Sequence, residues 1–384
     1  MNPAAEHEAG RTRARCAPSL GGRLLALKVG VVGLAGIGKR HLECYRESAL
    51  GDAVAVCDIV RVKADAMAAE FGARAYYSVA DMLAAEPDLD IVDVTTGGKE
   101  NGSWHFAPVM EALAHGRNVL VEKPLSSDIG QARAMVAEAE ARGVYLGCNI
   151  NHYFTPPAEK ARAMIDAGEL GELRYCLMKM GFSGGEELYG GAPQDPRVKG
   201  FPYFHAKAFL THPFSVMRYL CGDITHIQAF FGRPAFRQHA GEVLLSQTSI
   251  HARFANDCTG YLLSTRGDTP VGLGGWWSIE VGGTHGTLCI ENCIEKVTFW
   301  PVHRVGLGQQ PEATVTESGI RDFDQTFPRR IAAFLEDVGQ RVPHDRLRGS
   351  GRDALAALEY TFAAMESHER GGALVRPHPL PPQE

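Results

Sequence analysis

The sequence from residue 27 to about residue 150 alternates short apolar segments with longer amphipathic ones. Segments rich in Val and Ile occur at 28–32, 53–57, 91–94, 118–121 and 144–147. Between them lie stretches of helical length such as RVKADAMAAEFG and DIGQARAMVAEAEARG. Strands without a polar face are buried on both sides, and parallel strands need helical crossovers. This part of the chain is therefore predicted to be an α/β, doubly wound parallel sheet.

The pattern changes after about residue 155. PPAEKARAMIDAGELG predicts one helix, and strands are predicted after it at 173–181, 224–232, 245–255, 259–265, 276–282 and 286–290. Gly, Asp and Asn turns join these segments over short distances, which favours antiparallel pairing. Two further helices are expected near 324–340 and 352–368. The second part is thus predicted to be α+β, with a large open, mostly antiparallel sheet.

These patterns predict two domains in a chain of 384 residues. The expected divisions are a disordered leader at 1–26, a parallel-sheet domain at 27–150, an α+β domain at 151–377, and a flexible Pro-rich tail at 378–384. The closing helices are free to pack back on the first domain. The leader contains arginines but no separate apolar core, which argues against a secretory signal.

Composition excludes several classes of function. The net charge of −6 and the lack of a long basic run argue against nucleic acid as a partner. No apolar run reaches the roughly 18 to 20 residues of a membrane helix. Nine cysteines are scattered without paired spacing, which indicates free thiols in a reducing cytoplasm. Cys289 and Cys293 lack a second pair of ligands, so no metal site is predicted.

A glycine-rich turn joins the first predicted strand to the first helix. In KVGVVGLAGIGKRH the G-x-G-x-x-G register places Gly33 and Gly38 correctly, but Ala35 takes the middle position and an extra Gly36 follows it. A dinucleotide site needs a tight turn and backbone amides aimed at the pyrophosphate. The residues expected to supply them are Gly33, Ala35, Gly36, Ile37 and Gly38.

The second strand ends at Asp58, twenty residues after Gly38. A carboxylate there accepts hydrogen bonds from the ribose hydroxyls of the adenosine and repels a 2'-phosphate. NAD is therefore predicted as the cofactor and NADP is disfavoured, although Arg61 nearby weakens the distinction.

With this turn and EKP after the fifth strand, the chain resembles the Gfo/Idh/MocA oxidoreductase family from Lys28 to about Pro377. The resemblance includes DIVDVTT, HFAPVMEALAHGRNVLVEKPLS, NINHYFTP, AGELGEL, HPFSVMRYLCGDI, GGTHGTLCIE and SGRDALAALEYTFAAMESHERGG. It implies a Rossmann domain followed by an open α/β sheet domain used for oligomer contacts. It also implies that the nicotinamide faces the cleft between the two.

The resemblance assigns roles to the residues of EKP. Lys123 would hydrogen-bond the substrate hydroxyl that is oxidised and take part in proton transfer beside the nicotinamide. Glu122 would lie against the cofactor or tether the lysine. Pro124 would follow a cis peptide bond.

The family also carries D-x-x-x-H, and HAKAFLTHPFSVMRYLCGDI is the matching helix. His212 matches the histidine and is a candidate for catalysis or substrate contact, but Ala208 stands where the aspartate is expected. The spacing of four places both positions on one helical face. His205 and Lys207 are candidates to replace the missing group.

Further contacts follow from the same resemblance. Thr95 and Thr96 would meet the nicotinamide ribose and pyrophosphate, and His105 fits either a cofactor contact or a structural role at a helix start. Asn151 and Tyr153 would bind the substrate. Tyr153 stands where the family often has arginine, which makes a negatively charged substrate less favourable.

The leading hypothesis is an NAD-dependent dehydrogenase of a sugar, sugar derivative or cyclitol. One alternative is a lyase or glycosidase that uses bound NAD transiently, and another is a regulator that binds NAD and sugar without catalysis. A homodimer or homotetramer is expected from the resemblance.

Overall fold

The computed structural model describes residues 26–182, 201–233, 245, 247–266, 277–302 and 311–381. All of the predicted leader except residue 26, and the last three residues of the predicted tail, lie outside these ranges.

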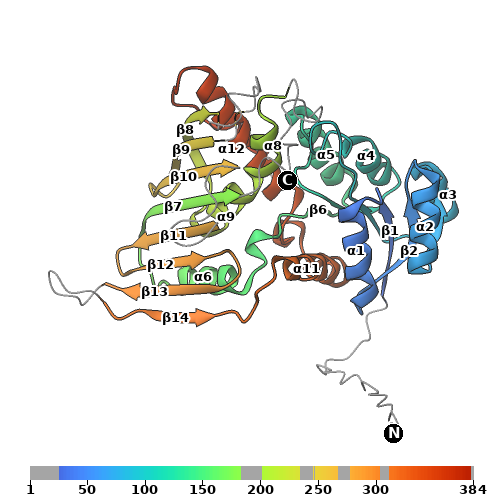
Figure 1. The fold of residues 1–384 in the computed structure, drawn as a ribbon, viewed down its shortest axis with the longest axis horizontal. Coiled ribbons are helices and arrows are strands. Elements are labelled where there is room, and N and C mark those ends of the chain that lie inside the picture. The colour runs from blue at the N-terminus through green and yellow to red at the C-terminus, as the bar shows by residue number, and fades with distance from the viewer. Residues whose placement is uncertain are drawn as a thin grey trace, which may run out of the picture.

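The first part of the chain forms a parallel sheet (Figure 1). Its described strands are β1 (Leu27–Val32), β2 (Gly51–Cys57), β3 (Arg74–Tyr76), β4 (Ile91–Val94), β5 (Asn118–Val121) and β6 (Leu146–Cys148). They are ordered β3-β2-β1-β4-β5-β6, and the pairs between them are parallel. The predicted doubly wound sheet is confirmed. The sequence pattern does not predict β3, because three residues are too few to show an apolar run.

Helices cover both faces of this sheet. They are α1 (Gly36–Glu47), α2 (Arg61–Phe71), α3 (Val79–Ala85), α4 (Phe106–Ala114) and α5 (Ile129–Arg142). Apolar residues of α1 and α2 share a core with Val29 and Val31 of β1, whereas α3, α4 and α5 pack on the other face. Ser78 and Asp128 cap α3 and α5 by accepting backbone N–H groups, which stops each helix from extending backwards.

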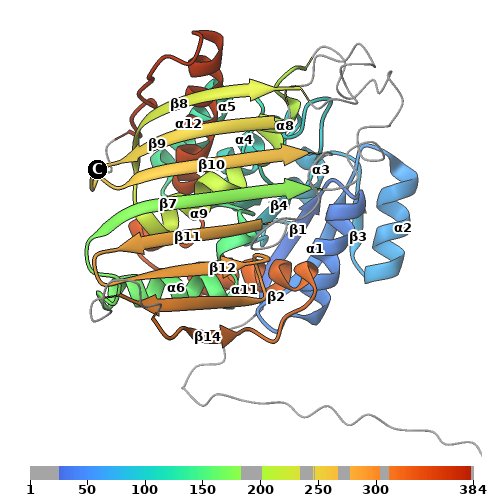
Figure 2. The same cartoon turned by 60° about the vertical axis from the view of Figure 1, so that its left-hand side comes forward.

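The second part of the chain forms a broad, open sheet (Figure 2). Its described strands are β7 (Leu173–Phe182), β8 (Ile224–Gly232), β9 (Gln247–Phe254), β10 (Thr259–Arg266), β11 (Trp277–Gly283), β12 (Gly286–Glu291), β13 (Lys296–Pro301) and β14 (Thr314–Glu317). Their order is β14-β13-β12-β11-β7-β10-β9-β8. Only the pair β7–β10 is parallel among these strands, so the predicted mostly antiparallel sheet is confirmed. Strands β13 and β14, at one edge of the sheet, were not predicted. The β14 strand is exposed along its whole length, so its sequence shows no apolar run.

The remaining helices lie on one face of the second sheet or return to the first. They are η1 (Asn151–Tyr153), α6 (Pro156–Asp166), α8 (Phe204–Phe209), α9 (Thr211–Cys221), η2 (Phe323–Gln325), α11 (Thr326–Gln340), η3 (His344–Arg346) and α12 (Gly351–Glu369). The α11 helix packs against α1, and Arg133 of α5 pairs with Glu359 of α12 at 2.7 Å. The limits of the two domains therefore stay a prediction, because both closing helices contact the Rossmann part.

The segment with His212 differs from the single helix expected. The chain forms α8 and α9, with Leu210 between them, so residue 208 and His212 belong to different helices.

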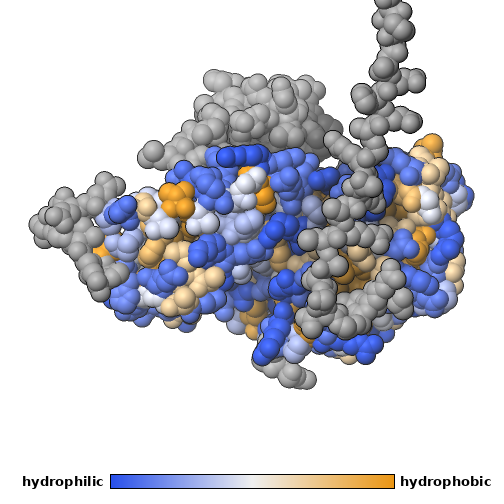
Figure 3. All heavy atoms as spheres, turned by 90° about the horizontal axis from the view of Figure 1, so that it is seen from below, coloured by the Kyte–Doolittle hydropathy of each residue, from blue (hydrophilic) through white to orange (hydrophobic). Residues whose placement is uncertain are grey.

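The face of the molecule seen in Figure 3 is mostly hydrophilic, with apolar residues in separate smaller patches. Within the described ranges, no helix combines the length and apolar character that a membrane span requires.

Candidate functional site

The strands of the first sheet all end at one edge, and polar residues follow several of them. Asp58 follows β2, Thr95 follows β4, Lys123 lies two residues after β5, and Asn149 follows β6. In doubly wound sheets ligands bind outside the carboxyl ends of the strands. This edge is therefore the candidate site.

The glycine-rich turn leaves the start of α1 open. Gly33 has φ +93°, and a Cβ added at Gly38 would lie 2.0 Å from the carbonyl oxygen of Gly33, so only glycine fits at Gly38. The N-cap residue is Ala35, which has no capping side chain, and the first turn of α1 contains no acid. Free N–H groups at a helix start favour an anion such as a pyrophosphate. Gly36 faces open space, and Ile37 is 42% exposed.

A cavity of about 460 Å³ lies over this edge. Gly33, Ala35, Asp58, Thr95 and Thr96 all line it, as do exposed apolar residues at its rim. Those rim residues are Ile59, Val60 and Trp104. Exposed apolar side chains gathered around a cavity indicate a ligand with an apolar part.

The Asp58 carboxylate lies at the end of β2 and is held by two backbone groups. Its oxygens accept the N–H of Leu34 at 2.9 Å and the N–H of Val60 at 2.8 Å. This fixes the carboxylate in the cavity lining, as a ribose-binding acid requires. Arg61 packs over the ring of Tyr77 at 4.0 Å, while Lys63 also lines the cavity.

Thr95, Thr96 and His105 shape the cavity through backbone contacts. Thr95 donates its hydroxyl to the carbonyl of Gly33 at 2.6 Å, and Thr96 donates to the carbonyl of Trp104 at 2.9 Å. His105 is buried, and its ring nitrogens lie against the carbonyl oxygens of Thr96 and Pro124. Burial lowers the pKa of His105 in spite of these two carbonyls. The His105 ring thus holds the backbone near Thr96 and near Pro124 together, and a direct cofactor contact stays a prediction.

Lys123 projects from the end of β5 toward α8 and α9. Its Nζ lies 3.5 Å from the carbonyl oxygen of Ala208 and 5.1 Å from the ring centroid of Phe209. A backbone carbonyl of residue 208 thus faces the lysine where the family pattern has an aspartate side chain. The Lys123–Pro124 peptide bond is cis, as the resemblance implies.

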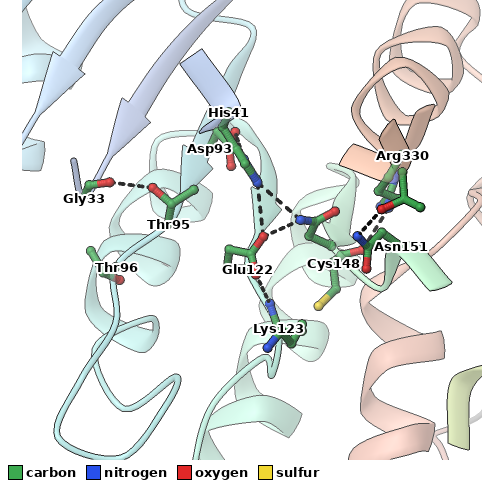
Figure 4. Close-up of polar contacts among 12 residues, drawn as sticks. Gly33, His41, Asp93, Thr95, Thr96, Glu122, Lys123, Cys148, Asn151 and Arg330 are labelled. Carbon is green, nitrogen blue, oxygen red and sulfur yellow. Dashed lines mark hydrogen bonds and ion pairs between the residues drawn. The ribbon is translucent and has the colours of Figure 1, made fainter. Parts of the chain in front are cut away.

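Glu122 points the opposite way, into a buried polar cluster (Figure 4). One carboxylate oxygen lies 3.1 Å from Nε2 of His41 and also accepts the side-chain amide of Asn149, and the other accepts the backbone N–H of Lys123 at 3.2 Å. The other ring nitrogen of His41 lies 2.7 Å from Asp93. Glu122 therefore tethers the main chain of Lys123, and the alternative role as a cofactor contact stays a prediction.

Charge explains the pKa values in this cluster. Burial would lower the pKa of His41, but Asp93 and Glu122 more than offset it and raise that pKa to about 10. Burial would raise the pKa of Glu122, but the hydrogen bond and charge of His41 lower it overall. Sequence reasoning missed His41, Asp93 and Asn149. The signal was Asp93 itself, an acid inside the apolar strand IVDV, since a buried carboxylate needs a partner.

His212 reaches the site from α9 and meets a histidine that sequence reasoning also missed. Its ring centroid lies 3.8 Å from that of His152 in η1, with the planes at 61°. Burial and the charge of Lys123 lower the pKa of His152 to about 3. Burial, His152 and Lys123 hold the pKa of His212 well below its usual range. Both rings are therefore uncharged at neutral pH.

The other substrate candidates are placed less favourably. Asn151 donates to the hydroxyl of Thr326 at 2.7 Å, and Tyr153 stacks on Tyr219 beside a different cavity. Lys207 pairs with Glu100 at 3.1 Å. The polar groups of Asn151 and Lys207 are thus engaged within the protein, and the substrate roles of Asn151, Tyr153 and Lys207 stay predictions.

His205 is buried, lies 3.3 Å from the hydroxyl of Ser264, and stacks on Phe209. The ring of Phe209 therefore contacts both His205 and Lys123. Among the described residues, no group of three or more His, Cys, Asp or Glu is placed to hold a metal ion.

Comparison with known proteins agrees with this geometry. Residues 27–150 match the family model described as an oxidoreductase family with an NAD-binding Rossmann fold, and residues 158–289 match the GFO/IDH/MocA C-terminal domain. The D-apiose dehydrogenase of Paraburkholderia graminis is 27% identical over 265 residues, which are 68% of this chain and 66% of the relative. The trans-1,2-dihydrobenzene-1,2-diol dehydrogenase of Macaca fuscata fuscata is 36% identical over 129 residues, 34% of this chain and 37% of the relative.

Solved structures share the fold at low identity. Levoglucosan dehydrogenase, in complex with NADH and levoglucosan, superposes with a TM-score of 0.77 at 17% identity, over 94% of this chain and 100% of that one. An NAD-binding oxidoreductase from Klebsiella pneumoniae gives 0.79 at 19% identity, over 92% and 100%. The two family models together span the parallel sheet and most of the open one. The chain belongs to the Gfo/Idh/MocA family of oxidoreductases, and residues 27–150 are its NAD-binding Rossmann domain.

Proposed function

We propose that the protein is an NAD-dependent dehydrogenase of a secondary alcohol in a sugar, sugar derivative or cyclitol. The observation that carries the proposal is the place of Lys123: it follows a strand of the NAD-binding sheet, lies against α8, and is near enough to the histidines of η1 and α9 for its charge to lower the pKa of each. The relatives named as dehydrogenases of D-apiose and of a dihydrobenzene diol support a substrate that carries hydroxyl groups.

In this function Gly33, Gly36 and the open start of α1 hold the pyrophosphate, and Asp58 holds the adenosine ribose. Bound there, NAD would supply the hydride acceptor for the carbinol carbon. Lys123 in its neutral amine form would hydrogen-bond the hydroxyl on that carbon and take up its proton, becoming the ammonium. The tether from Glu122 to the backbone N–H of Lys123 keeps the lysine in position for both steps.

The groups that could exchange a proton with Lys123 differ from the D-x-x-x-H pattern of the family. At residue 208 the lysine meets a neutral carbonyl oxygen and not a carboxylate. Burial, together with His152 and the charge of Lys123, lowers the pKa of His212, so its imidazole stays neutral and able to accept a proton or hydrogen bond.

The test is NADH formation by the purified protein with a panel of sugars and cyclitols. Turnover that disappears in Lys123→Met but persists in Lys160→Met, an exposed lysine on α6, supports the proposal. NAD affinity should survive in both variants. A converted sugar without net NADH favours the lyase or glycosidase class. Sugar binding without any conversion favours a regulator.

We further propose that a second copy of the chain covers the open face of the second sheet, with the apolar residues Leu177, Tyr261 and Leu263 at its centre. They are 47%, 42% and 42% exposed, respectively. Leu177 and Tyr261 are paired on the adjacent strands β7 and β10, so their side chains lie side by side. Lys179 lies beside Glu280 and Glu291 in the same surface hollow. Opposite charges on one patch suit a two-fold contact, in which each copy of the chain supplies both charges.

Free thiols in the described residues support the expectation of a reducing cytoplasm.

A further inference from the structure

A second cavity, of about 380 Å³, is separate from the one over the edge of the Rossmann sheet. Its walls come from η1, α6, α9, the loop at 345–349 and the first turn of α12. It shares no lining residue with the cavity that contains Asp58 and Thr95. Its volume falls in the range of about 300–1,000 Å³ that is usual for small-molecule sites.

Tyr153 brings a hydroxyl group without a partner to this cavity. The residue lines the cavity and is 7% exposed. Phe154 and Tyr219 stack on its ring at 4.8 Å and 4.6 Å between centroids, so the edge of the ring and not its faces can meet the cavity. Within the described ranges, the Tyr153 hydroxyl forms no hydrogen bond. A buried hydroxyl costs stability unless it is hydrogen-bonded, so this one calls for a partner in the cavity.

Both tyrosines of the stacked pair can donate a hydrogen bond. Burial and the charge of Asp353 raise the pKa of Tyr153 well above its usual range. Burial and the charge of Glu159 raise the pKa of Tyr219 to about 12. The Tyr219 hydroxyl also has no hydrogen-bond partner in the part of the chain that the structure describes. Both hydroxyls therefore keep their protons at neutral pH and are available to an anionic oxygen.

The charged side chains around the cavity balance in sign, but two of them are unpaired. The lining contains three arginines and three acids, namely Glu159, Arg218, Asp345, Arg346, Arg348 and Asp353. Four of these are held in ion pairs of 2.5 to 2.8 Å, which are Arg218 with Asp353, Arg348 with Asp337, and Glu159 with Arg329. Among the described residues, the side chains of Asp345 and Arg346 form no ion pair or hydrogen bond. The cavity thus offers a ligand one cation and one anion.

The rest of the lining is apolar or already engaged. Phe154 and Leu347 are apolar and nearly buried. Ser215 donates its hydroxyl to the carbonyl of His212 at 2.8 Å, and the carbonyl of Gly349 already accepts two hydrogen bonds. These residues can pack against an aliphatic or aromatic group but bring no further charge.

We propose that this cavity is a second ligand site, which binds a small zwitterion with one carboxylate and one ammonium group, as in an α-amino acid. The carboxylate accepts hydrogen bonds from Tyr153 and Tyr219 and pairs with Arg346, while the ammonium group pairs with Asp345. A ligand with a single charge would meet one of the two unpaired side chains as a repelling charge, whereas a zwitterion suits both. The site is separate from the proposed dehydrogenase function, so its test measures binding and not turnover.

The test uses the whole chain in the presence of NAD. Each standard amino acid is added separately, and the thermal midpoint of unfolding is measured. The amino acid that raises the midpoint most is then titrated calorimetrically beside its amide, which lacks the carboxylate, and its des-amino acid, which lacks the ammonium group. We expect at least one amino acid to raise the midpoint, and both analogues to bind about tenfold more weakly or worse.

Two variants and a control locate the site. Tyr153→Phe keeps the stacked ring and removes only the hydroxyl, and Arg346→Gln removes the unpaired cation. Arg321→Gln is the matched control, because its side chain is 72% exposed and lies outside the cavity. We expect Kd for the amino acid to rise about tenfold or more in the first two variants and to stay unchanged in the control. An unchanged Kd for NAD in all three shows that they are folded.

Three results would each overturn the assignment. They are a midpoint that no amino acid raises, an analogue that binds as tightly as its parent, and unchanged binding in either Tyr153→Phe or Arg346→Gln. Because no sugar or cyclitol is turned over in these measurements, failure of the dehydrogenase proposal would leave this result standing, and the reverse also holds.

Discussion

The Nδ1 atom of His41 lies 2.7 Å from a carboxylate oxygen of Asp93, and both side chains are fully buried. Glu122 lies 3.1 Å from the other ring nitrogen, so one imidazolium joins α1, β4 and the end of β5. Glu122 also holds the backbone N–H of Lys123. A buried charged cluster therefore stands directly behind the proposed catalytic lysine.

Replacing His41 should destabilise the protein strongly. His41→Gln leaves two buried carboxyl groups without their cation, and we expect the free energy of unfolding to fall by about 3–5 kcal/mol at pH 7. Tyr45→Phe, which removes one hydrogen bond of 2.8 Å to Asp93, should lose only about 1.5–3 kcal/mol. Urea denaturation measures both.

The contribution of His41 should depend on pH in one direction. Its pKa is raised from 6.5 to about 10, so its stabilisation is complete below pH 6.5 and is lost as the pH rises toward 10. The difference between the wild type and His41→Gln should shrink between pH 7 and pH 10. A constant difference over this range would show that His41 is not charged in the folded protein.

The pH dependence of stability that comes from His152 and His212 should have the opposite sign to that from His41. The pKa of His152 is lowered from 6.5 to about 3, so between these two pH values the ring is protonated in the unfolded chain but not in the folded protein. Stability should therefore fall as the pH drops below 6.5, by up to about 1.4 kcal/mol per pH unit for this one group. His152→Phe should have a shallower dependence between pH 6.5 and pH 4.5. The same slope in both proteins would count against an uncharged buried ring.

Two glycines of the turn should respond differently to alanine. In Gly38→Ala the new Cβ meets the carbonyl oxygen of Gly33 at 2.0 Å, and relieving this contact should cost about 1–3 kcal/mol and weaken NAD binding. In Gly36→Ala the Cβ meets nothing within 4 Å, so the thermal midpoint of the free protein should hardly change. Equal midpoints for the two variants would contradict the turn geometry.

Asp58 should control the choice between NAD and NADP. Asp58→Asn keeps an oxygen that can accept one of the two backbone N–H groups but removes the charge that repels a 2'-phosphate. We expect the ratio of Kd for NADP to Kd for NAD to fall about tenfold, which corresponds to about 1.4 kcal/mol. Calorimetric titration of both cofactors measures it. If the ratio does not move, the ribose lies elsewhere.

The open face of the second sheet should determine the oligomeric state. Leu177→Glu places a charge at the centre of the proposed contact, so we expect a dimer or tetramer to dissociate in light-scattering chromatography. Leu374→Glu is the matched control, because Leu374 is 65% exposed outside the sheet. A monomeric wild type, or two variants that behave alike, would contradict this interface.

Local pattern was sufficient for most of the fold. Apolar runs and the amphipathic stretches between them identified five of the six Rossmann strands and the helices around them, because burial on both faces leaves a trace in every strand. The sequences of the short β3 and the exposed β14 contain no apolar run of this kind. The break between α8 and α9 at Leu210 also went unpredicted, although Pro213 in the first turn of α9 marks it, because proline has no N–H to donate to the carbonyl of Phe209.

The sequence by itself determined the order of the elements, the glycine turn, the acid at Asp58 and the position of Lys123 at the edge of the sheet. Each of these depends on residues close together in the chain. Only the tertiary structure decided that His41 joins Asp93 to Glu122, and that His152 and not Asn151 or Tyr153 meets His212. These partners come from separate elements, and their pairing depends on how the elements pack, which no local periodicity records.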